Sequence, residues 1–298
     1  LGGLRGSGGG SSSQDSGLRP RLVESLPPCM NGCPNHNAIR EMLMTISKAE
    51  DLGKPYEQAF EEAFYIFLET TPFPSTCGRV CPHPCESACR RALVDEPISI
   101  MVLKRVASDH EWLHNHTPPM QPKPSTGKRV MVVGAGPAGL TTAYYLALEG
   151  HQVKIIDMLH EPGGTVAVGI PDYRMPRDLL QREADVITAL GVEIEYGVKL
   201  GRDVSLRELK EQYDAVFLGT GAFKSKPMGV EGEDQGYDGF SECGIHYLRK
   251  VALGEPIETP PRVVVVGGGN TAIDCVRVAL REGAEESILL YRRTRKEM

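Results

Sequence analysis

The chain of 298 residues has no apolar run of about eighteen residues, so its sequence predicts no membrane span. It also has no excess of positive charge, because 39 acidic residues and 33 basic ones give a net charge of -6. That balance argues against a nucleic-acid surface. The N-terminus lacks the apolar stretch of a secretory signal peptide. With 41% hydrophobic and 24% charged residues, we expect a globular protein of about two domains in a reducing, cytoplasmic compartment.

The eight cysteines are too unevenly distributed for a secreted disulfide scaffold, because six of them fall in the first third of the chain. These six are Cys29, Cys33, Cys77, Cys81, Cys85 and Cys89. Pro82 and Pro84 forbid a regular helix through the second group. Thiolates on an irregular loop favour an iron–sulfur cluster. The alternatives are zinc, with His83 as a possible further ligand, and reduced structural thiols.

The composition changes along the chain and divides it into five parts. We expect a disordered Gly/Ser tail (1–20), a helical cysteine module (21–113), a Pro-rich linker (114–127) and two nucleotide-binding units (128–260 and 261–298). The chain begins with Leu1 rather than Met and stops just after a predicted strand, so we expect it to be a fragment. The predicted fold class is α/β. A helical iron–sulfur module precedes two nested, doubly wound Rossmann-like domains with parallel sheets, of which the second is truncated.

A glycine-rich turn follows the first predicted strand, residues 129–133. Its sequence Gly134-Ala135-Gly136-Pro137-Ala138-Gly139 fits G-x-G-x-x-G and opens a predicted helix. Such glycines allow a tight turn, the approach of a pyrophosphate and close helix–strand packing, and the helix N-terminus attracts the phosphates. Asp157 ends the next predicted strand, where a carboxylate accepts a hydrogen bond from a ribose hydroxyl. This unit is therefore predicted to bind a dinucleotide.

A second turn of this kind, Gly267-Gly268-Gly269-Asn270-Thr271-Ala272, fits G-x-G-x-x-A between a predicted strand and a predicted helix. Near the place where the first unit carries Asp157, this unit has Arg292 and Arg293. Arginines can fork onto a 2′-phosphate, which favours NADP over NAD. The alternative is that these arginines are simply solvated.

Seven stretches together resemble a known family. They are PPCMNGCP (27–34), PFPSTCGRVCPHPCESACRR (72–91), GAGPAGL (134–140), EPGGTVAVGIPDYRMPRDLLQRE (161–183), LGTGA (218–222), GGGNTAIDC (267–275) and YRRTRKEM (291–298). In combination they resemble the glutamate synthase small-subunit-like family of FAD/NADPH iron–sulfur oxidoreductases. Dihydropyrimidine dehydrogenase carries a similar module at its N-terminus.

The resemblance implies which residues hold the cofactors. FAD would be held by the first glycine turn, Asp157, Gly163-Gly164-Thr165 and Arg174, while Val80 brings the cysteine module against the flavin. NADPH would contact Gly269, Asn270, Thr271, Arg292 and Arg293. Cys33, Cys81 and Cys85 would belong to one 4Fe-4S cluster, and Cys29 with Cys89 to another.

The sequence departs from the family at two places. The family usually carries a further C-x-x-C just before Cys29, where this chain reads RLVESL (21–26), so the second cluster would lack two ligands here. Some relatives also use Gln or Glu as a fourth ligand near Lys104, and a lysine cannot serve in that way. Cys77 is the substitute ligand that we expect. The family's final FAD-contacting strand would lie beyond Met298.

The implied function is electron input: hydride passes from NADPH to FAD, and single electrons pass to a 4Fe-4S cluster and on to a partner subunit or fused domain. No side chain is expected to act as a nucleophile. A disulfide reductase is disfavoured because no cysteine pair lies near the flavin turn. Two alternatives remain: a flavin reductase with a structural zinc module, and a non-catalytic FAD-bearing assembly subunit. The terminal acceptor is not indicated by the sequence.

Overall fold

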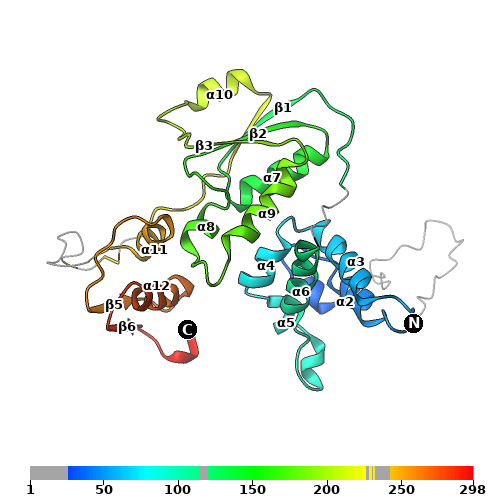
Figure 1. Ribbon diagram of the computed structural model, residues 1–298, viewed down its shortest axis with the longest axis horizontal. Coiled ribbons are helices and arrows are strands. Elements are labelled where there is room, and N and C mark those ends of the chain that lie inside the picture. The colour runs from blue at the N-terminus through cyan, green and yellow to red at the C-terminus, as the bar shows by residue number, and fades with distance from the viewer. Residues whose placement is uncertain (1–25, 115–119, 226–227, 230, 232–241, 298) are drawn as a thin grey trace, which may run out of the picture.

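The computed structural model describes residues 26–114, 120–225, 228–229, 231 and 242–297 (Figure 1). The predicted tail at 1–20 lies outside these residues, as do residues 115–119 of the predicted linker. Figure 1 shows three lobes: a sheet with its helices at the top, a helical lobe at the lower right, and a smaller strand–helix unit at the lower left.

In the amino-terminal lobe, residues 26–114 of the described chain form helices and no strand. They are α1 (Pro28–Gly32), α2 (Ile39–Ser47), α3 (Tyr56–Leu68), α4 (Pro74–Val80), α5 (Pro84–Ser87), η2 (Arg90–Leu93) and α6 (Ile100–Leu113). Its core contains Ile39, Met42, Phe64, Phe67 and Trp112, with Cys29, Cys33 and Cys85 packed in or against it. These helices agree with the helical module expected for this part of the chain. The chain between α4 and α5 is non-helical, as Pro82 and Pro84 predict, and His83 there has a left-handed φ of 43°.

Residues 120–127 run along the end of α7 (Pro137–Leu148) rather than across open solvent. The Lys123 N–H donates to the carbonyl of Leu148, and the Thr126 N–H donates to the carbonyl of Gly150. Gly150 has a φ of 86°, and a Cβ there would lie 2.3 Å from the Pro124 carbonyl oxygen. The described part of the linker is thus packed on the lobe that follows it.

The second lobe is built on a parallel sheet with strand order β3-β2-β1-β4. Its strands are β1 (Arg129–Val133), β2 (Gln152–Asp157), β3 (Glu193–Tyr196) and β4 (Ala215–Leu218). In register, Val133 lies opposite Ile156 on one side and Leu218 on the other. The helices of this lobe are α7, α8 (Thr165–Gly169), α9 (Arg177–Thr188) and α10 (Leu206–Gln212).

Each face of this sheet is covered by different helices, as expected where strands and helices alternate. Val132 and Ile155 pack with Leu140 and Tyr144 of α7 and with Ile187 of α9. On the opposite face, Met131, Val133 and Ile156 pack with Leu209 of α10. The carboxyl ends of β1 and β2 therefore meet the start of α7, which is where ligands bind in open α/β sheets.

The third lobe contains α11 (Gly244–Leu253), β5 (Arg262–Val266), α12 (Asn270–Arg281), β6 (Glu286–Leu290) and η3 (Arg295–Glu297). Strands β5 and β6 pair in parallel, so this part is a second β-α-β unit. The predicted α/β class with a helical amino-terminal module and parallel sheets is confirmed. Among the helices that the structure describes, none is both long and apolar enough to cross a bilayer.

Candidate functional site

The first glycine turn connects β1 to α7 and has the geometry of a dinucleotide cradle. A Cβ on Gly139 would lie 1.8 Å from the Gly134 carbonyl oxygen, and one on Gly134, whose φ is 108°, would lie 2.4 Å from the Gly219 oxygen. Glycine is thus required at both positions. At Gly136 an added Cβ would meet only the Cα of Gly164, at 3.9 Å. Open space at this glycine suits the close approach of a pyrophosphate to the backbone.

The turn at residues 163–165 lies beside this cradle. The Gly163 N–H donates to the Ala135 carbonyl over 2.8 Å, and both Gly163 and Gly164 have positive φ. Helix α8 begins at Thr165, while Pro137 and Ala138 form the first turn of α7. The structure thus brings the predicted FAD residues of the two turns into one place.

Asp157 at the end of β2 faces the glycine turn. Its Oδ2 accepts from the Ala135 N–H over 2.6 Å, and its Oδ1 accepts from the Leu159 N–H over 2.7 Å. Each carboxylate oxygen has a second lone pair. The carboxylate is therefore oriented by the backbone and retains acceptor capacity for a ribose hydroxyl.

The second glycine turn is more open. Helix α12 starts at Asn270, with Gly269 as its N-cap and Thr271 in its first turn, and a Cβ on Gly269 would meet nothing within 4 Å. The Tyr291 ring packs so closely on Gly268 that an added Cβ would lie 2.5 Å from it. Arg292 and Arg293 follow β6 and are exposed, so both guanidinium groups are accessible to a phosphate.

Arg174 lies between the two nucleotide-binding units. Its Nη1 is 2.5 Å from Oδ2 of Asp274, a buried carboxylate on α12. Burial raises the pKa of Asp274, and Arg174 opposes that rise. Beside this pair, Tyr173 lies under the guanidinium groups of Arg277 and Arg281, at 4.5 and 3.9 Å from its ring centroid. The expected FAD contact of Arg174 stays a prediction, and the sequence did not indicate its partner Asp274.

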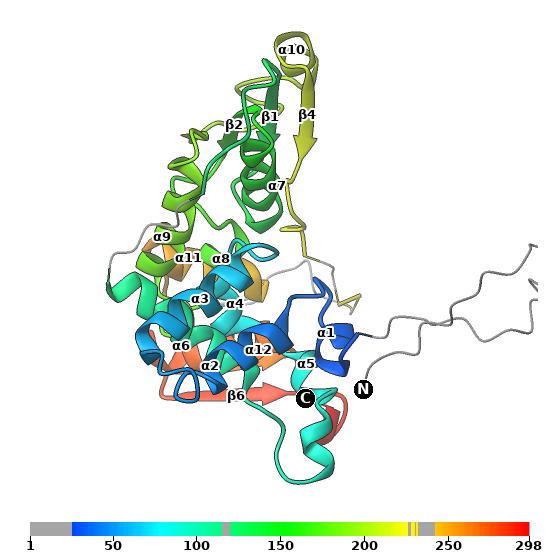
Figure 2. The same ribbon diagram turned by 90° about the vertical axis from the view of Figure 1, so that its right-hand side faces the viewer.

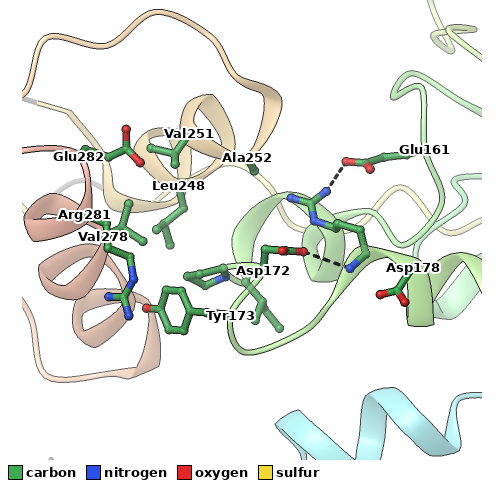
Figure 3. Close-up of a pocket in the computed structure, with 13 residues that line it drawn as sticks. Glu161, Asp172, Tyr173, Asp178, Leu248, Val251, Ala252, Val278, Arg281 and Glu282 are labelled. Carbon is green, nitrogen blue, oxygen red and sulfur yellow. Dashed lines mark hydrogen bonds and ion pairs between the residues drawn. The ribbon is translucent and has the colours of Figure 1, made fainter. Parts of the chain in front are cut away.

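A cavity of about 560 Å³ adjoins this contact (Figure 3). Figure 3 shows Tyr173 and Asp172 on one side, from the segment after α8, and Leu248 and Val278 of α11 and α12 on the other. Arg177 is held at its rim by an ion pair with Glu161. The two nucleotide-binding units thus line a common cavity.

The six amino-terminal cysteines fall into two groups. Burial is the main reason that the pKa of Cys77 rises to about 11, with Lys104 lowering it and Cys81 and Cys33 raising it further. The pKa of Cys85 is also raised by burial and then by Cys81 and Cys33. Burial likewise raises the pKa of Cys29, and the nearby thiol in that case is Cys89. Four sulfurs therefore lie near one another, and Cys29 lies with Cys89.

Short helices produce this grouping. A Cβ on Gly32 of α1 would lie 3.2 Å from both the Ala88 Cβ and the Pro84 carbonyl oxygen, so α1 lies directly against α5, as Figure 2 also shows. The His83 N–H donates to the Cys81 Sγ over 3.3 Å. Cys33 is thereby brought to the loop that carries Cys81 and Cys85.

The four-cysteine group of Cys33, Cys77, Cys81 and Cys85 supplies four thiols, the number that a 4Fe-4S cluster binds. Among the residues that the structure describes, no three Cys, His, Asp or Glu side chains converge enough to hold a single metal ion. A tetrahedral zinc needs its sulfurs about 2.3 Å from one point. In a 4Fe-4S cluster each thiolate binds its own iron atom, so the sulfurs lie farther apart. Raised thiol pKa values are compatible, because a coordinating metal deprotonates its thiols.

The cysteine module and the first glycine turn share a second cavity, of about 380 Å³. Thr76 and Cys77 of α4 line it from one lobe, while Pro137 and Gly163 line it from the other. Val80 packs against the apolar cluster of Leu159, Ala167, Val168, Met175 and Leu180, which surrounds α8. The helix that carries Cys77 thus adjoins the dinucleotide cradle.

Sequence reasoning missed the buried Glu183 near this contact and considered Lys104 only as a residue that cannot bind the cluster. Glu183 of α9 is 1% exposed and accepts hydrogen bonds from α4. Lys104 is 7% exposed, and its charge lowers the pKa of Cys77. In the sequence, Glu183 stands among the charged residues of an amphipathic helix, where a solvated face is the usual interpretation. Its pairing depends on a tertiary contact that no local pattern indicates.

Sequence comparisons agree with this geometry. Residues 128–296 match the family described as pyridine nucleotide-disulphide oxidoreductase. Residues 24–116 match the family described as dihydropyrimidine dehydrogenase domain II, 4Fe-4S cluster.

Three curated relatives resemble most of the chain. The NADPH-Fe(3+) oxidoreductase subunit beta of Geobacter sulfurreducens is 59% identical over 91% of this chain and 39% of its own length. The NADP(+)-dependent formate dehydrogenase subunit beta of Moorella thermoacetica is 41% identical over 100% of this chain and 44% of its own length. The glutamate synthase [NADPH] small chain of Escherichia coli is 35% identical over 91% of this chain and 58% of its own length. The chain thus spans about two fifths to three fifths of the length of these relatives.

The family predicted from the motifs is confirmed, together with its cofactors FAD, NADPH and a 4Fe-4S cluster. The chain belongs to the pyridine nucleotide-disulphide oxidoreductase family, and its amino-terminal 4Fe-4S domain makes it a member of the glutamate synthase small-subunit-like group.

Proposed function

We propose that this chain is the electron-input module of a larger oxidoreductase, taking reducing equivalents from NADPH and delivering them to a partner subunit or domain. When bound, FAD would accept hydride from NADPH, and a 4Fe-4S cluster would accept electrons from the flavin one at a time. The residues of the chain provide binding, orientation and exclusion of water.

The observation that carries this proposal is the cavity of about 380 Å³ lined by both Cys77 and Gly163. A purely structural metal module need not adjoin the flavin cradle, whereas a module that accepts electrons from the flavin must. Here the cysteine-bearing helix α4 and the glycine turn contribute to one cavity. This juxtaposition favours electron transfer over the alternative of a structural zinc module.

The binding roles follow from the two turns. We propose that FAD is held by residues 134–139, Asp157, residues 163–165 and Arg174, and that Val80 makes the apolar contact from the cysteine module. NADPH would lie on Gly269, Asn270 and Thr271, with its 2′-phosphate near Arg292 and Arg293. The cluster ligands would be Cys33, Cys77, Cys81 and Cys85.

The partner belongs to the proposal as well. Two of the relatives are named as beta subunits and a third as a small chain, which supports a separate catalytic or electron-accepting subunit. The relatives differ in the acceptor that their names give, so the proposal specifies electron delivery rather than the acceptor. A cytoplasmic location is part of it, because six clustered thiols stay reduced only in a reducing compartment.

The test is anaerobic addition of NADPH to the purified holoprotein. We expect the flavin to bleach, with NADPH faster than NADH, and we expect Arg292→Ala with Arg293→Ala to remove most of that preference. A protein that contains iron and FAD but whose flavin does not bleach would support the non-catalytic alternative. A zinc-loaded, iron-free protein whose flavin still bleaches would support the structural zinc alternative.

A further inference from the structure

The carboxylate of Glu183 connects the flavin lobe to the cysteine module. Glu183 lies on α9, is 1% exposed, and faces the start of α4. Its Oε1 accepts from the Ser75 N–H over 2.7 Å and from the Thr76 N–H over 3.1 Å. The Thr76 hydroxyl lies 2.5 Å from Oε2. Figure 1 shows α4 beside α9, where the two lobes meet.

These bonds replace a cap that α4 lacks. The residue before α4 is Phe73, which makes no side-chain capping bond, and Pro74 occupies the first turn. The first N–H groups of a helix need acceptors, and a side chain of the preceding residue usually supplies one. Here the acceptor comes from more than one hundred residues further along the chain. The start of α4 is thus fixed by the flavin lobe.

The neighbouring residue strengthens the same contact. Arg182 donates to the Trp112 carbonyl over 2.8 Å, and the Trp112 indole N–H donates to the Ser75 hydroxyl over 2.6 Å. Two consecutive residues of α9 therefore contact both α4 and the end of α6. Burying a carboxylate is costly, so the bonds from α4 are needed to keep it there.

The helix that Glu183 holds is the one that reaches the flavin cradle. Cys77 follows Thr76 directly, Val80 ends α4, and Cys81 is its C-cap. Thr76 and Cys77 line the cavity shared with Gly163. We propose that Glu183 is a positioning residue that fixes α4, and with it Cys77 and Val80, at its place beside the flavin cradle, so that electron delivery to the cysteine module depends on it. This inference rests on the proposed function.

The test uses the full-length holoprotein and four variants. Glu183→Ala removes all three bonds. Glu183→Gln keeps an oxygen for the two N–H groups and offers an N–H to the Thr76 hydroxyl. Thr76→Val removes the hydroxyl alone and leaves both backbone bonds. The matched control is Asp109→Asn, because the Asp109–Arg79 ion pair of 2.8 Å also ends on α4 but stays within the helical lobe.

Three quantities are measured: the rate at which NADPH bleaches the flavin, the rate at which the EPR signal of the reduced cluster develops, and hydrogen exchange at the amides of residues 74–80. Electron transfer between two centres slows as the distance between them grows, so a displaced α4 would slow electron delivery to the cluster. We therefore expect Glu183→Ala to slow the cluster signal by about tenfold or more, with flavin bleaching unchanged and exchange at Ser75 and Thr76 increased. Glu183→Gln should recover most of the rate, Thr76→Val should fall between them, and Asp109→Asn should match the wild type.

The outcomes are separable. If Glu183→Ala delivers electrons to the cluster at the wild-type rate, or if Asp109→Asn slows delivery equally, the positioning role is wrong. If Glu183→Ala does not fold, Thr76→Val still decides the matter, because a wild-type rate of cluster reduction in this variant, with unchanged exchange at α4, contradicts the positioning role. Failure of the proposed function itself would be seen in the wild type, as no flavin bleaching or no cluster signal.

Discussion

Arg174 and Asp274 form an ion pair 2.5 Å long that joins the flavin lobe to helix α12 of the second nucleotide-binding unit. The two partners differ in exposure, with 26% of the Arg174 side chain exposed against 3% for Asp274. The segment that precedes α9 is therefore bound to α12 by an interaction that is buried on the α12 side. Because Tyr173 lies beside Arg277 and Arg281, the relative placement of the two units depends on a small group of neighbouring residues.

The difference in exposure predicts unequal effects of removing each partner. Arg174→Ala leaves a buried carboxylate without its ion-pair partner, so we expect the free energy of unfolding to fall by about 3 kcal/mol. Asp274→Ala leaves an arginine that can turn into water, so we expect a loss of about 1 kcal/mol. Urea unfolding of both variants measures the two losses. Equal losses, or a larger one for Asp274→Ala, would contradict this assignment of the buried side.

Two of the three glycines of the first turn, Gly139 and Gly136, predict opposite outcomes for one added methyl group. Gly139→Ala would place a Cβ 1.8 Å from the Gly134 carbonyl, so we expect a loss of stability of about 1–3 kcal/mol or more. Gly136→Ala meets only the Gly164 Cα at 3.9 Å, so the apoprotein should fold normally but retain at most about one tenth of its FAD affinity. Thermal unfolding and FAD content measure the two effects. If Gly136→Ala binds FAD with wild-type affinity, the pyrophosphate does not lie against Gly136.

Glu183 predicts a pH dependence of stability. Burial is the main cause that raises its pKa from 4.5 to about 7, against the bonds from Thr76 and Ser75 and the charge of Arg79. Between these two values the folded chain retains a proton that the unfolded chain has lost, so the free energy of unfolding falls as the pH rises. Glu183→Gln removes this contribution.

The stability of Glu183→Gln relative to wild type should therefore increase from about pH 4.5 to about pH 7 and then level off. Melting temperatures across this range measure the difference and cancel titrations that both proteins share. A difference that stays constant with pH would mean that the folded carboxyl keeps its ordinary pKa.

The four-cysteine group predicts which thiol completes the cluster. Cys77→Ser should lower the iron content by the iron of one cluster and remove its EPR signal, because Cys77 lies with Cys33 and Cys81. Cys275→Ser is the control, since Cys275 is a buried cysteine of α12. Iron and zinc analysis of both proteins measures the outcome. Full iron in Cys77→Ser would show that another group serves as the fourth ligand.

Local patterns accounted for much of this structure. The glycine turns predicted β1, α7, β5 and α12 because strand, tight turn and helix follow one another within about thirty residues of chain. Pro82 and Pro84 predicted the break between α4 and α5. The pairings of Glu183 with Ser75 and of Arg174 with Asp274 were not predictable, because they join residues about one hundred positions apart and their charged residue types are usually solvated.

The central claim is that the flavin cradle passes electrons to the cysteine module beside it. The most direct measurement is a single turnover in which the anaerobic holoprotein receives one equivalent of NADPH and is frozen at successive times for EPR and visible spectra. We expect the flavin to bleach first, and the signal of the reduced cluster then to grow as flavin absorbance returns. A flavin that stays fully reduced while the cluster signal never develops would contradict it.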